Sequence, residues 1–204
     1  MAVDAHVYFA FVRHFRPARI VEVGAGYSTL VAVAAATRNA EDGPRPEIVA
    51  VDPYPPDFLA DALDGTGRVV ADRVQNVDLS LFTSLAPNDI LFIDSTHVLR
   101  SGGDVQTEYC EILPRLGHGV LVQVHDVSLP KPYPRTYFDQ RLYWNEQYLL
   151  QAFLAFNFRF EVIWPGNYIA VSHPAEVREL IPEYDAMRAK YPESEPSSFW
   201  MRVR

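Results

Sequence analysis

The stretch IVEVGAGYST at residues 20–29 decides the fold. It begins with a largely apolar run that is typical of a buried strand, and two spaced glycines follow at once. Gly24 and Gly26 have no Cβ, so the backbone can turn tightly there and approach a ligand closely. Ser28 or Thr29 is well placed to cap the alanine-rich helix that follows. The stretch therefore predicts a strand, a glycine turn and a helix, the arrangement of a nucleotide-type cofactor site.

Strand and helix patterns alternate through most of the chain. Strands are expected over 19–23, 47–51, 68–73, 90–93 and 119–124, and helices over 3–15, 29–37, 104–116 and 144–156. A terminal hairpin is expected over 158–164 and 168–172, then a helix over 175–190, and the last dozen residues as a surface tail. The predicted fold class is α/β, a Rossmann-like, doubly wound, mostly parallel sheet with a C-terminal antiparallel hairpin strand. We expect one domain over 1–204, with its core at about 16–173.

Composition excludes several function classes. The chain has 18 Lys and Arg against 26 Asp and Glu, a formal charge of −8, and its basic residues are scattered, so nucleic acid is not an expected partner. Cys110 is the single cysteine and cannot form an intrachain disulfide, and the first 15 residues carry charges, unlike a signal peptide. No run approaches the about 20 apolar residues of a membrane span. A cytoplasmic protein without membrane association is therefore expected.

The glycine turn suits one cofactor better than another. A dinucleotide site would show a third glycine in G-x-G-x-x-G, and Thr29 stands at that position. S-adenosylmethionine has no phosphate and needs only the close approach that Gly24 and Gly26 allow. Glu22 could then contact the amino-acid portion of S-adenosylmethionine. Asp52, at the end of the second strand, could bind the ribose hydroxyls.

Four segments in this order resemble the class I S-adenosylmethionine-dependent methyltransferases, particularly small bacterial O-methyltransferases. They are VEVGAG at 21–26, VAVD at 49–52, FIDSTH at 92–97 and VHD at 124–126, and the resemblance covers about 16–173. It implies an enzyme that binds S-adenosylmethionine. The cofactor contacts that it implies are Glu22, Gly24, Gly26, Ser28 and Asp52, with Gln75 and Val77 of the stretch 75–78 near the adenine.

Polar side chains follow the fourth and fifth predicted strands. Asp94 and His97 come after the fourth strand, and His125 and Asp126 come after the fifth. Ligands of open α/β sheets lie beyond the carboxyl ends of the strands, so we expect these four side chains to lie close together. Two carboxylates and two imidazoles could hold a divalent metal or carry out acid–base chemistry.

This layout is similar to that of metal-dependent O-methyltransferases of the catechol type. The resemblance implies Asp94 as the first metal ligand, His125 and Asp126 as the following pair, and His97 as the base, although His97 stands where those enzymes have a lysine. Imidazole suits Mn, Fe, Co or Zn at least as well as Mg. The implied reaction transfers the sulfonium methyl group to a hydroxyl whose proton a neutral His97 accepts. Without a metal, Asp94 or Asp126 would orient His97.

Aromatic residues after the fifth strand could wall the acceptor pocket. They are Tyr133, Tyr137 and Trp144. The expected partner is a small-molecule acceptor. Its pocket is either open or completed by the second subunit of a homodimer.

Three other functions remain compatible with this sequence. An NAD-dependent oxidoreductase is disfavoured by Thr29 and by the terminal hairpin. A metal-dependent hydroxylase of the same fold would use the two histidines and the carboxylates. A non-catalytic cofactor-binding protein would keep the fold without turnover.

Overall fold

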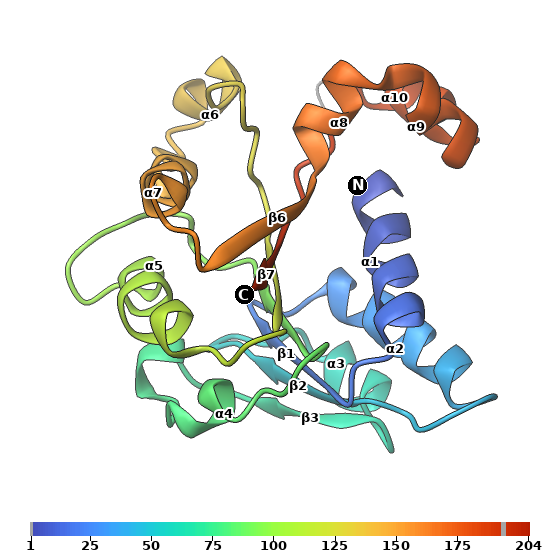
Figure 1. Cartoon of the computed structure of the whole chain (residues 1–204), viewed down its shortest axis with the longest axis vertical. Coiled ribbons are helices and arrows are strands. Elements are labelled where there is room, and N and C mark those ends of the chain that lie inside the picture. Colours follow the sequence, from blue (N-terminus) through green and yellow to red (C-terminus); the bar gives the residue numbers. More distant parts are fainter. Residues whose placement is uncertain (1, 193–194) are drawn as a thin grey trace.

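The computed structural model describes residues 2–192 and 195–204. Within them, seven strands form one sheet in the order β3-β2-β1-β4-β5-β7-β6. Figure 1 shows the sheet with helices around it. The strands are β1 (Arg19–Val23), β2 (Glu47–Val51), β3 (Gly67–Val70), β4 (Ile90–Ile93), β5 (Leu121–Val124), β6 (Phe160–Pro165) and β7 (Phe199–Val203). The first five pair in parallel, and β7 runs antiparallel to β5 and β6. This arrangement confirms the predicted fold class.

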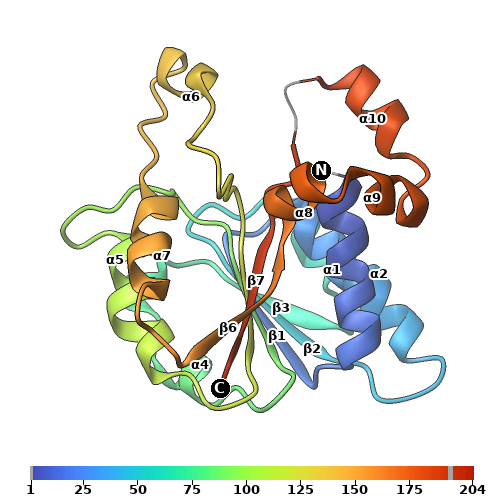
Figure 2. The same ribbon diagram turned by 45° about the horizontal axis from the view of Figure 1, so that its top comes forward.

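Helices cover both faces of the sheet (Figure 2). One face carries α1 (Ala2–Phe15), α2 (Tyr27–Asn39) and α3 (Phe58–Ala62), and the other carries α4 (Ser80–Thr83), α5 (Asp104–Thr107) and α7 (Glu146–Leu154). Two further groups extend beyond one end of the sheet: α6 (Arg135–Asp139), and α8 (Gly166–Ser172) with α9 (Pro174–Leu180) and α10 (Tyr184–Lys190). No helix in the described ranges has the length and apolar character that crossing a membrane requires.

Alternate strand residues point to opposite faces and build two apolar clusters. Val21, Leu91 and Val122 belong to the cluster on the α5 and α7 face. On the α1 and α2 face, four residues of neighbouring strands stand in register, in the order Glu22, Phe92, Gln123 and Trp200. All four are buried, so this row places two polar side chains, Glu22 and Gln123, beneath α1.

The C-terminal part of the chain corrects two predictions. Residues 168–172 are not the second hairpin strand, because they belong to α8. The last residues are not a surface tail either: β7 lies inside the sheet between β5 and β6, and its Trp200, Met201 and Val203 are fully buried. The antiparallel strand pair is therefore real, but its second strand comes 33 residues after the first, beyond the reach of a local turn pattern.

Two predicted helices are present in altered form. The helix expected over 104–116 begins as α5 and continues as a π-helical turn, Glu108–Ile112, and a 3-10 turn, Leu113–Arg115. The helix expected over 175–190 is divided into α9 and α10. Pro182 lies between them, and proline cannot donate the backbone hydrogen bond that a continuous helix needs.

Candidate active site

Half of the predicted site residues line two cavities at the carboxyl ends of the parallel strands. The α1 cavity, about 360 Å³, is walled by Tyr8 of α1 and by Phe92 and Gln123 of the sheet. The loop cavity, about 650 Å³, lies under the segment 95–104 and beside Gln75. Three residues line both: Gly24, Asp52 and Asp94. The two cavities therefore adjoin, and a single ligand can occupy both.

The glycine turn between β1 and α2 forms the border of both cavities. Gly24 has a φ of +80°, and a Cβ there would lie 1.9 Å from the carbonyl oxygen of Asp94. Only glycine fits this position, because the turn packs directly on the end of β4. Gly26 precedes α2, and a Cβ there would have no atom within 4 Å. Gly24 thus allows the fold, and Gly26 leaves open space for a ligand.

Glu22 supports this turn from below. Its carboxylate accepts hydrogen bonds from the Tyr8 hydroxyl, at 2.9 Å, and from the Thr29 hydroxyl, whose oxygen accepts the backbone N–H of Gly26 at 3.2 Å. Burial raises the pKa of Glu22 to about 7, against the effect of these hydrogen bonds. Glu22 lines neither cavity. It therefore shapes the turn through Thr29, and a contact between Glu22 and the cofactor stays a prediction.

Asp52 fixes the other side of the turn. Its Oδ2 accepts the backbone N–H of Ala25 at 3.0 Å, and its Oδ1 accepts that of Tyr54 at 2.7 Å. These bonds leave the carboxylate half-buried at the border of the two cavities.

The remaining predicted cofactor residues separate into two groups. Ser28 lines the α1 cavity, and Gln75 lines the loop cavity, where its amide donates to the carbonyl oxygen of Gly102 at 3.2 Å. Val77 lines neither of them and packs instead against the apolar cluster on the α5 face. Gln75 is thus the residue of its stretch that reaches the cavity.

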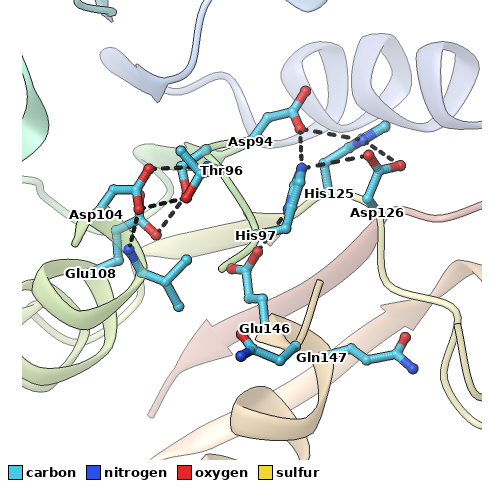
Figure 3. Close-up of polar contacts among 12 residues, drawn as sticks. Asp94, Thr96, His97, Asp104, Glu108, His125, Asp126, Glu146 and Gln147 are labelled. Carbon is cyan, nitrogen blue, oxygen red and sulfur yellow. Dashed lines mark hydrogen bonds and ion pairs between the residues drawn. The ribbon is translucent and has the colours of Figure 1, made fainter. Parts of the chain in front are cut away.

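Three carboxylates surround the buried ring of His97 (Figure 3). Nε2 lies 3.3 Å from Asp94 Oδ1 and 3.5 Å from Asp126 Oδ2, and Nδ1 lies 2.8 Å from Glu146 Oε2. One ligand atom from each of Asp94, His97 and Asp126 lies within 4.8 Å of the others. Two carboxylates and one imidazole in such a group can hold a divalent cation.

His125 lies at the edge of this group. Its Nδ1 is 3.2 Å from Asp126 Oδ1 and 3.7 Å from Asp94 Oδ1, and its ring faces Phe92 in the α1 cavity. Asp126 has a φ of +54°, so the chain turns sharply after β5 and both side chains reach the same region. We call Asp94, His97 and Asp126 the metal-capable group. It contains His97 in place of His125, which the sequence predicts as a ligand.

Neighbouring charges shift the pKa values of His97, His125 and Asp126. Burial opposes the charge of His97, but Asp94, Glu146 and Asp126 outweigh it and raise the pKa of His97 to about 10. Against the same burial effect, Asp126 and Asp94 raise the pKa of His125 to about 9. Burial favours the protonated form of Asp126, yet the two histidines lower its pKa to about 2. These carboxylates therefore favour the charged form of His97 at pH 7, whereas the predicted role as a base requires the neutral form.

The three aromatic residues predicted for the acceptor pocket form a cluster beside His97. The ring of Trp144 lies 4.4 Å from that of His97 and 4.7 Å from that of Tyr137, measured between centroids. Tyr133 is buried and accepts the backbone N–H of Gln147 through its hydroxyl at 3.1 Å. None of the three lines the α1 or the loop cavity. Through Trp144, this cluster packs against the His97 ring. That its residues wall the acceptor pocket stays a prediction.

Sequence reasoning missed three residues of the site. Tyr8 and Gln123 line the α1 cavity, and the Oε1 atom of Gln123 has no hydrogen-bond partner among the described residues. A polar residue inside the apolar run of β5 was a signal for Gln123. Glu146 lies 49 residues from His97, and nothing in the local pattern connects the two.

Comparisons with known proteins identify the family and the fold of this chain. A family model described as "Methyltransferase domain" matches residues 21–127. An uncharacterized protein of Archaeoglobus fulgidus is 40% identical over 90 residues, which are 43% of this chain and only 40% of that protein.

Two solved structures share the fold. The apo structure of CalS11, a TDP-rhamnose 3'-O-methyltransferase of calicheamicin biosynthesis, has a TM-score of 0.61 and 14% identity, over 98% of this chain and 79% of that chain. NcsB1, an O-methyltransferase from neocarzinostatin biosynthesis, was solved with S-adenosylhomocysteine and 1,4-dihydroxy-2-naphthoic acid. It has a TM-score of 0.53 and 15% identity, over 99% of this chain and 54% of that chain.

Proposed function

This chain belongs to the methyltransferase domain family, and we propose that it transfers the methyl group of S-adenosylmethionine to a hydroxyl group of a small molecule. One observation carries the proposal: Asp94 lines both cavities and also belongs to the metal-capable group. A ligand that spans the two cavities must pass this carboxylate. The family match makes a nicotinamide-dependent oxidoreductase or a hydroxylase the less favoured alternatives.

The two cavities suggest how the cofactor would lie. Its adenosine would occupy the loop cavity, where Asp52 can accept hydrogen bonds from the ribose hydroxyls and Gln75 would border the adenine. Its sulfonium would lie near Asp94, where a carboxylate favours the positive charge. The α1 cavity then remains for the methionine portion and for the acceptor.

The chemistry requires alignment and removal of one proton. The oxygen–carbon bond forms as the carbon–sulfur bond breaks, and the hydroxyl proton must leave the acceptor. Asp94 is the carboxylate placed to take it, since its side chain keeps 33% exposure and borders both cavities. The charged His97 ring holds the carboxylates of Asp94 and Asp126 in place from below.

The donor set also fits a divalent cation. Asp94, Asp126 and Nε2 of His97 would hold it, with loss of the Nε2 proton. A bound cation would lower the pKa of a coordinated acceptor hydroxyl. Two carboxylates with one imidazole suit Mn, Fe, Co or Zn at least as well as Mg.

The relatives with this fold support a small acceptor. CalS11 is described as acting on TDP-rhamnose, and NcsB1 was solved with a dihydroxynaphthoic acid. Both compounds carry hydroxyl groups. We therefore place the acceptor among hydroxylated natural-product-like molecules.

Binding and turnover can be tested together. Isothermal titration of the purified chain with S-adenosylhomocysteine and, separately, with NADH should give binding of the first alone. A mixture of hydroxylated small molecules with S-adenosylmethionine should then yield S-adenosylhomocysteine, and Asp94→Asn should form it at least about 100-fold more slowly. Binding of NADH but not of S-adenosylhomocysteine would contradict the proposal.

A further inference from the structure

Glu146 lies behind His97, on the side of the ring opposite Asp94 and Asp126 (Figure 3). It is the first residue of α7, and its side chain is only 1% exposed. Its Oε2 lies 2.8 Å from Nδ1 of His97, the shortest of the three contacts between this ring and a carboxylate. A buried carboxylate in this place needs a chemical reason, because burying a charge is costly unless it has a partner.

The start of α7 also holds the backbone of His97. The His97 carbonyl oxygen accepts the N–H groups of Asn145 and Glu146, at 3.0 and 3.2 Å. Asn145 Oδ1 accepts the N–H of Leu99 at 2.6 Å, and the Trp144 ring packs on the imidazole. These contacts keep His97 at its left-handed φ of +59°. The backbone is thus already fixed without the Glu146 side chain.

We infer that Glu146 is a positioning residue that decides which ring nitrogen His97 offers to the site. An ionised carboxylate can only accept a hydrogen bond, so Nδ1 must carry the proton that points to Glu146. Nε2 is then the nitrogen that faces Asp94 and Asp126, and it is the nitrogen that would lose its proton and offer its lone pair to a cation. The inference rests on the proposed function only in assigning Nε2 to that site.

A glutamine at this position separates the chemical role from packing. Glu146→Gln has nearly the same shape, but its carboxamide can either donate to Nδ1 or accept from it. Glu108→Gln is the matched control. Glu108 is equally buried and lies under the same loop, where it accepts the Ser95 hydroxyl at 3.1 Å and makes no hydrogen bond or ion pair with His97 among the described contacts.

The experiment follows the imidazole N–H protons directly. In protein labelled with ¹⁵N-histidine, long-range ¹H–¹⁵N spectra identify Nδ1–H of His97, with His97→Gln for assignment. We expect a downfield, slowly exchanging Nδ1 proton in the wild type and in Glu108→Gln. In Glu146→Gln its exchange with water should become at least about 10-fold faster, because the ionised acceptor of this hydrogen bond is replaced by a neutral one. Mn²⁺ affinity, measured by titration calorimetry, should fall about 10- to 100-fold in Glu146→Gln alone.

The outcomes keep this inference distinct from the proposed function. A folded Glu146→Gln with wild-type Nδ1–H exchange and wild-type Mn²⁺ affinity would overturn the inference. If Glu146→Gln does not fold, the wild-type spectrum decides, and a proton on Nε2 with none on Nδ1 would overturn it. Failure of the wild type to bind S-adenosylhomocysteine would remove the proposed function, whereas the Nδ1–H result would still stand for or against Glu146.

Discussion

Nε2 of His97 lies 3.3 Å from Oδ1 of Asp94, three residues earlier in the chain. His97 adopts a left-handed backbone conformation, which non-glycine residues rarely do, and its ring turns back beneath the end of β4. Through this contact, the His97 ring links Asp94, which borders both cavities, to the buried Glu146 of α7. Strained conformations of this kind persist where the surrounding structure holds them and are frequent at active sites.

Asp94→Asn should weaken Mn²⁺ binding at least about 10-fold, because it removes one of two ionised oxygen ligands. Calorimetric titration with Mn²⁺ measures the effect, and S-adenosylhomocysteine affinity should stay within about threefold of the wild type. Asp72→Asn is the control. Asp72 is exposed, lies outside the metal-capable group and accepts a hydrogen bond from Asn76, so this variant should bind Mn²⁺ as the wild type does. Equal Mn²⁺ affinity in both variants would exclude Asp94 as a ligand.

Asp52→Ala should weaken S-adenosylhomocysteine binding about 10- to 100-fold. The change removes a group expected to bind the ribose and frees the N–H groups of Ala25 and Tyr54, and hydrogen bonds to a charged group contribute about 1.5–3 kcal/mol. Asp57→Ala, at an exposed aspartate that lines neither cavity, serves as the control in the same titration. An unchanged affinity in Asp52→Ala would place the adenosine elsewhere.

Gly24→Ala and Gly26→Ala should differ sharply in stability. The first forces a side chain into a φ of +80° and against the Asp94 carbonyl, so we expect a loss of more than about 2 kcal/mol in the free energy of unfolding. The second meets no atom within 4 Å and should change that free energy by less than about 1 kcal/mol. Urea unfolding of both variants makes the comparison, and equal losses would show that the turn is not built as described.

Glu22 should make stability depend on pH. Its pKa is raised by burial from about 4.5 to about 7, so the folded chain binds this proton more tightly than the unfolded chain does. Stability is therefore lost as pH rises from about 4.5 to about 7, by roughly 2 to 3 kcal/mol between pH 5 and pH 8. Urea unfolding of the wild type and Glu22→Gln at both pH values isolates this contribution as the difference between the two proteins.

Glu47→Gln is the control for the Glu22 experiment. Glu47 is exposed and lies 3.8 Å from Arg68 at the surface, so its loss should leave the pH dependence of the wild type intact. A Glu22→Gln protein that loses as much stability between pH 5 and pH 8 as the wild type would contradict the buried, proton-binding state of Glu22.

Local patterns predicted the parallel half of the fold well. The apolar runs ending at Val23, Val51, Ile93 and Val124 became β1, β2, β4 and β5, since buried parallel strands are continuous apolar segments. The antiparallel end could not be placed in the same way. The partner of β6 is β7, and pairing across 33 intervening residues leaves no turn signal next to either strand.

The sequence predicted the site residues that directly follow a strand. It did not predict those that reach the site from a distant part of the chain. Asp94 and Asp126 follow β4 and β5, so the rule of the carboxyl edge placed them together correctly. The exchange of His125 for His97 in the compact group depends on two left-handed residues that no sequence pattern showed. The raised pKa of His97 depends on Asp94 and also on Glu146, whose approach requires the folded position of α7.

A crystal structure of the chain with S-adenosylhomocysteine tests the central claim most directly. We predict the ribose at Asp52, the adenine in the loop cavity beside Gln75, and the sulfur facing the carboxylate of Asp94 where the two cavities meet. A ligand bound outside these cavities, or a sulfur directed away from Asp94, would contradict it.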